Sequence, residues 1–74
     1  MNNAFLTLNY TTKTADLTLQ DGTLKTFSGS RYRAVKSAIT YIRQHKIPTD
    51  ISATIEQLTE SVHPIGPKIE RLLF

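Results

Sequence analysis

The stretch SRYRAVKSAITYIRQHK, residues 30–46, decides the fold that we expect for this chain. Seven of its side chains recur at helical spacing and fall within one arc of about 160° when successive residues are placed 100° apart. They belong to Ala34, Val35, Ala38, Ile39, Tyr41, Ile42 and His45. Residues 28–30 offer N-caps, and Pro48 predicts that the helix ends near His45 or Lys46. We therefore expect one long amphipathic helix that lies on a sheet.

The outward arc of the same helix is basic. It holds Arg33, Lys36, Thr40, Arg43 and Gln44. From residue 22 to residue 49 the chain carries six Lys or Arg residues and no Asp or Glu, a formal +6, although the net charge of the whole chain is only +3. The remainder holds three cations and all six acids, a formal −3. Such segregation creates a local positive potential, which favours an anionic partner.

Upstream of the helix, two stretches alternate between apolar and polar side chains. Residues 4–10 and 15–19 follow this period of two, which is typical of strands with one buried face. The Asp-Gly pair at 21–22 predicts a tight two-residue hairpin turn, which would place Leu19 opposite Leu24. The first part of the chain is therefore expected to form an antiparallel meander of three strands.

The segment after the long helix allows two interpretations. Helical spacing relates four of its apolar side chains, those of Ile51, Ile55, Leu58 and Val62. The β-branched residues within 52–58 instead favour a strand, and of the two we expect the helix. Pro67 then predicts a short last helix that ends at Leu73. The expected fold class is α+β: a small three-stranded antiparallel meander packed by one long amphipathic helix, then two shorter C-terminal helices, in one domain over residues 1–74.

The size and composition of the chain limit the functions that it can have. The chain has 74 residues and no cysteine, so its core is thin and no disulfide supports it. A domain without disulfides fits the cytoplasm better than secretion. The sequence begins without a secretory signal, and no apolar run approaches the ~20 residues that cross a bilayer. We expect a cytoplasmic protein without membrane contact, and the thin core leaves a homodimer open.

The two histidines and six carboxylates form no catalytic or metal-binding pattern. His45 and His63 are far apart in the sequence, and neither has a second histidine or a carboxylate at metal-ligand spacing. His45 lies at the edge of the apolar arc, which is typical of a packed structural histidine, and His63 is expected at a helix end. A chain of this size also has little room for a closed pocket. We therefore expect no enzyme, no metal site and no cofactor.

Residues 65–68, Ile-Gly-Pro-Lys, precede the predicted last helix and follow a predicted helix that ends near Val62. This segment resembles the hairpin and second helix of the helix-hairpin-helix family. Pro64 stands where that family has its first glycine, and Glu70 stands where it has a small residue. The resemblance implies binding to the DNA backbone without sequence preference, with Lys68 in contact with a phosphate.

Two functions fit these features. The first is a nucleic-acid-binding domain whose basic helix face neutralises phosphates. Its candidate contacts are Lys25, Arg31, Arg33, Lys36, Arg43, Lys46 and Lys68. The second is a small protein-binding module or inhibitor, of the kind that phages and mobile elements encode, which docks the same helix on an acidic protein surface. Charge complementarity alone does not distinguish phosphate from carboxylate. The sequence favours nucleic acid as the anionic partner.

Overall fold

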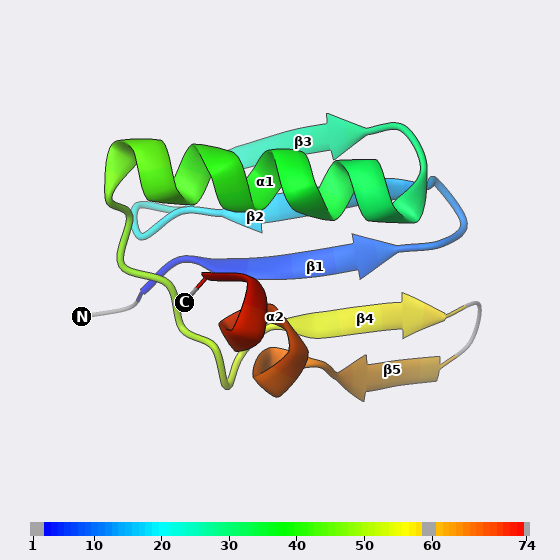
Figure 1. Ribbon diagram of the computed structural model, residues 1–74. Coiled ribbons are helices and arrows are strands. Elements are labelled where there is room, and N and C mark those ends of the chain that lie inside the picture. Colours follow the sequence, from blue (N-terminus) through cyan, green and yellow to red (C-terminus); the bar gives the residue numbers. More distant parts are fainter. Residues whose placement is uncertain (1–2, 59–60, 74) are drawn as a thin grey trace.

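The structure is a computed structural model that describes residues 3–58 and 61–73, with only the backbone for Arg31 and Leu73. Over this part of the chain the strands form one five-stranded sheet. Both helices lie on the same face of this sheet (Figure 1). The elements in chain order are β1 (Phe5–Asn9), β2 (Thr14–Thr18), β3 (Leu24–Ser28), α1 (Arg31–His45), β4 (Ile55–Leu58), β5 (Ser61–Pro64) and α2 (Gly66–Leu73). No helix in the described ranges is long and apolar enough to cross a membrane.

The central strand of the sheet is β1, and the strand order is β3-β2-β1-β4-β5. β1 pairs antiparallel with β2, where Leu6 lies opposite Leu17, and parallel with β4, where Leu8 lies opposite Glu56. Parallel neighbours need a crossover connection, and α1 provides it. The crossover brings residues that are far apart in the sequence onto one face of the sheet.

The core lies between this face and the two helices. Its buried side chains are those of Ala4, Leu6, Leu8, Ala15, Leu17, Ala34, Val35, Ala38, Ile39, Ile42, Ile65 and Ile69. The alternation predicted for residues 4–10 and 15–19 is confirmed, since every second residue in β1 and β2 is buried. Removing this apolar surface from water is the main stabilising contribution in a domain that has no disulfide.

The long helix is confirmed with its ends. The Ser30 hydroxyl accepts a hydrogen bond from the Arg33 amide at 3.3 Å, which caps the N-terminus of α1. At the other end Lys46 takes a left-handed conformation, and the Ile47 amide donates to the Ile42 carbonyl at 3.0 Å. These local signals are strong enough that the sequence alone predicts the helix.

The turn between β2 and β3 differs from the two-residue hairpin that we expected. The Gly22 amide donates to the Leu19 carbonyl at 3.0 Å, and the Leu19 amide donates to the Thr23 carbonyl at 2.8 Å, so the loop has three residues. Leu24 therefore lies opposite Thr18, and not opposite Leu19. Because a shift of one residue reverses the faces of a strand, Leu24 is 59% exposed on the side away from the helices.

The prediction of a three-stranded sheet followed by two shorter helices is wrong. The meander β1-β2-β3 and the last helix are present, but the segment expected as a middle helix forms the hairpin β4-β5 instead. The helical spacing from Ile51 to Val62 was misleading, because Val62 is 58% exposed in an edge strand. Pairing with β1 satisfies the backbone of β4, and this tertiary contact outweighs the local pattern.

Candidate binding surface on the helix layer

The predicted basic residues gather on the side of the sheet that carries the helices. Arg33, Lys36 and Arg43 are exposed on α1, Lys46 follows its last turn, and Lys68 is exposed on α2. Lys25 reaches the same side from β3, because it lies opposite the buried Leu17. The side chain of Arg31, also predicted for this site, lies outside the described part of the structure.

These cations are not neutralised within the described ranges, where none of the six forms an ion pair. The two acids nearest to the basic segment are engaged in their own turns. Thr23 donates hydrogen bonds from its side chain and its amide to Asp21, and they hold the pKa of that carboxyl below its ordinary value. Bonds from the Ser52 hydroxyl, and then from the Ala53 and Ser52 amides, lower the pKa of Asp50 against a smaller opposing effect of burial. Both carboxylates are therefore held by hydrogen bonds within their own turns, and neither forms a described ion pair with the six cations.

Two of the cations lie over aromatic rings, one on each side of α1. On the flank toward β3, the Lys25 ammonium lies 5.1 Å from the centre of the Tyr41 ring, and Tyr41 packs against Phe27 and His45. His45 was expected to pack at the edge of the apolar arc of α1, but its side chain is exposed and contacts the Tyr41 ring at the end of the helix. On the flank toward α2, the Lys36 ammonium lies 5.7 Å from the centre of the Tyr32 ring.

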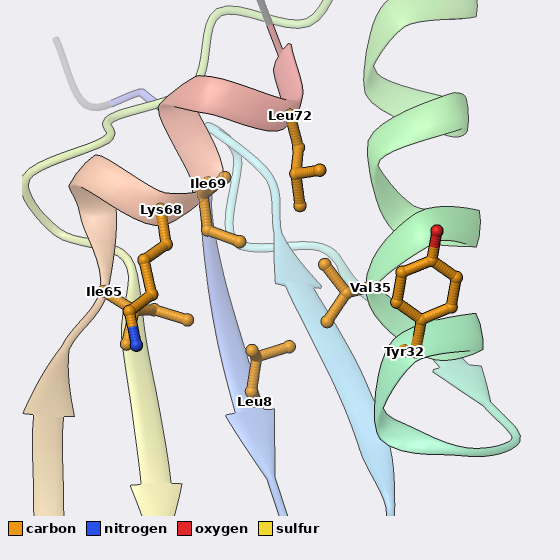
Figure 2. Close-up of a pocket in the computed structure, with 7 residues that line it drawn as sticks. All are labelled: Leu8, Tyr32, Val35, Ile65, Lys68, Ile69 and Leu72. Atoms are coloured by element: carbon orange, nitrogen blue, oxygen red, sulfur yellow. The ribbon is translucent and has the colours of Figure 1, made fainter.

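The flank toward α2 borders a hollow between the two helices. Figure 2 shows Leu8 from β1 at its floor, Val35 from α1 on one wall, and Ile69 and Leu72 from α2 on the other. Its volume is about 200 Å³. The described residues that line it are Leu8, Tyr32, Val35, Ile65, Lys68, Ile69 and Leu72. The floor is buried, whereas Tyr32 and Leu72 are 67% and 50% exposed at the rim.

A second hollow of about 160 Å³ continues along α1 and shares Tyr32, Val35 and Leu72 with the first. The other described residues that line it are Lys36, Ile39, Thr40 and Arg43. We name the two together the α1–α2 groove. It has an apolar floor and basic rims, with Lys36 and Arg43 on the α1 side and Lys68 on the α2 side.

Sequence reasoning missed this groove because its walls come from three elements that only the fold brings together. The local signals were Tyr32, an exposed aromatic one turn before Lys36, and Leu72, four residues after Lys68. Lys68 itself was predicted from the helix-hairpin-helix resemblance, and that resemblance does not hold. The segment before α2 is the β4-β5 hairpin, so His63 lies in β5 and not at a helix end.

One buried carboxylate lies away from the groove. Glu56 in β4 is 6% exposed, and the Tyr10 hydroxyl donates a hydrogen bond to its Oε1 at 2.7 Å. His63 lies opposite Glu56 in the register of β4 and β5 but is exposed at the sheet edge. Neither Glu56 nor His63 lines the α1–α2 groove.

No group of three or more potential metal ligands occurs among residues 3–58 and 61–73. Comparisons with protein-family models, with curated proteins and with solved structures each found no match.

Proposed function

We propose that this chain is a non-catalytic binding domain that docks on an acidic protein surface through the α1–α2 groove. The observation that supports this function is the apolar hollow set between cations that form no ion pair with a described residue: Lys36 and Arg43 on one rim and Lys68 on the other. Interfaces of this kind combine an apolar centre with a polar rim. We place the protein in the cytoplasm, because a domain without cysteine gains nothing from an oxidising compartment.

The chemistry of the hollow favours a protein partner over a nucleic acid. Its floor and walls are aliphatic, from residues such as Leu8, Val35 and Ile69. A nucleotide base inserted there would lose hydrogen bonds between its polar edges and water, which costs free energy unless they are replaced. An aliphatic or aromatic side chain has no such edges to satisfy. We therefore rank a protein partner ahead of nucleic acid, which reverses the order that the sequence favoured.

Nucleic acid is the second candidate, and the outward face of α1 favours it. Arg33, Lys36 and Arg43 are exposed along this face, and α1 contains no acid to repel a phosphate. If each neutralised one phosphate, the logarithm of the affinity would fall against the logarithm of salt with a slope of about −3. A protein partner held partly by apolar contacts would show a shallower slope.

The test is affinity capture from a nuclease-treated lysate of the source organism, with the wild type and with a Lys36→Glu, Arg43→Glu variant. We expect the wild type to retain an acidic protein that the variant loses, and the purified pair to bind with a shallow salt slope. In parallel, the anisotropy of labelled duplex DNA, single-stranded DNA and RNA is measured at two salt concentrations. Nucleic-acid binding with a slope near −3, together with no retained protein, would replace this proposal by the second candidate.

A further inference from the structure

We propose that the occupant of the α1–α2 groove is an amphipathic helix with an acidic rim on both sides of its apolar stripe. This inference rests on the proposed function and names the class of its partner. The apolar side chains of such a helix would enter the two hollows, and its carboxylates would meet Lys36 and Arg43 on one side and Lys68 on the other. Helix-in-groove docking is a common mode of peptide recognition.

The shape of the groove suits two apolar anchors of one ligand. The two hollows adjoin at Tyr32, Val35 and Leu72, so two neighbouring anchors of one ligand can fill them. Anchors at i and i+3 or i+4 of a helix point to the same side, which suits adjoining hollows. Tyr32 and Leu72 stand exposed at the rim, where a docked helix would cover them.

The spacing of the rim cations suits carboxylates on a partner helix. Lys36 and Arg43 are seven residues apart on α1, which corresponds to about 10.5 Å along a helix axis. A partner helix lying alongside α1 can present carboxylates at the same i, i+7 spacing. Among the residues that the structure describes, neither hollow is lined by an Asp or Glu side chain, so no described acid of the groove would repel them. Charge complementarity therefore selects an acidic helix from among the apolar ligands that the floor accepts.

The experiment is a selection from a phage-displayed library of helical peptides, carried out on the folded full-length chain. We expect the selected peptides to share two apolar anchors at i and i+3 or i+4, with Asp or Glu enriched at i, i+7 spacing on the flanks. Their affinities are then measured for the wild type and for Leu72→Glu and Leu24→Glu. Both leucines are at least half exposed, but Leu24 lies on the opposite face of the sheet, so Leu24→Glu is the matched control.

We expect Leu72→Glu to weaken the selected peptides by about tenfold or more, and Leu24→Glu to leave their affinity within about twofold, because anchor positions dominate binding. Failure to select any peptide, selection of basic or unpatterned peptides, or equal losses in the two variants would overturn the inference. A groove filled by a second copy of the chain would appear as a dimer in sedimentation and would also overturn it.

Failure of this inference is distinguishable from failure of the proposed function. If the captured protein is lost from both the Lys36→Glu, Arg43→Glu variant and Leu72→Glu, but no acidic helical peptide is selected, an acidic protein docks in the groove without presenting such a helix. In that case the proposed function stands and the helix-in-groove inference falls. If both variants keep the captured protein, both proposals fail.

Discussion

At the scale of single residues, Gly66 shows how closely α2 approaches the rest of the chain. A Cβ atom at this position would lie 2.0 Å from the carbonyl oxygen of Ile51, so no other residue fits without a shift of the backbone. Gly66 is the first residue of α2, the helix that carries Ile69 and Leu72. A backbone shift at Gly66 would therefore disturb the α2 wall of the groove, although Gly66 does not line it.

Gly66→Ala is expected to destabilise the fold by about 2 kcal/mol or more, because the added methyl group meets rigid backbone. Gly22→Ala is the control. Gly22 has φ +91° but open space around it, so its substitution costs about 1–2 kcal/mol of backbone strain without a steric clash. Urea denaturation of both variants measures the difference. Equal effects at the two positions would contradict the close approach of Ile51.

The turn acids give a prediction for pH dependence. Hydrogen bonds lower the pKa of Asp50 in the folded state, so its contribution to stability is present above the ordinary carboxyl pKa of about 4 and is lost as the pH falls through the lower folded value. Asp50→Asn should therefore flatten the loss of stability in acid, measured by urea denaturation from about pH 5 to pH 2.5. Asp16→Asn, at a carboxylate that accepts no hydrogen bond from a described residue, is the control. If the free energy of unfolding of Asp50→Asn fell in acid as steeply as that of the wild type, this role would be refuted.

At the scale of elements, local signals decided what the sequence could predict. The ends of α1 follow from its cap residues, and β1 and β2 follow from their alternation. The β4-β5 hairpin could not be predicted in this way, because β4 is stabilised by pairing with β1, with Leu8 and Glu56 as neighbours across 48 positions of sequence. Without β4 beside β1, α2 has no place next to α1. The groove between the two helices therefore could not be predicted from the sequence either.

The basic face of α1 gives the prediction at this scale. Arg33, Lys36 and Arg43 changed together to Glu should abolish binding of the anionic partner, since each site then repels it. All three are exposed and free of described ion pairs, so the helix content should stay unchanged and the melting temperature should move little. Circular dichroism and a binding assay on the same sample check both statements. Binding that survives in a folded variant would remove α1 from the interface.

At the scale of the whole molecule, the two sides of the sheet differ in charge. The side with the helices carries all the described cations of the candidate site. On the opposite side, the register leaves Asp16 as the one charge among the described strand residues, in a surface rich in threonine. This difference in charge between the two faces orients an acidic partner toward the helices before contact is made. The groove then provides the apolar contacts that charge alone does not supply.

The measurement that tests the central claim most directly is a titration of the methyl-labelled chain with a selected acidic peptide, followed by NMR. Occupation of the groove predicts shifts in the methyl signals of Val35, Ile65, Ile69 and Leu72, and unchanged signals for Leu24 and Val62 on the open face and edge of the sheet. Shifts at Leu24 and Val62, with none in the groove, would show that the partner binds elsewhere and would contradict the account.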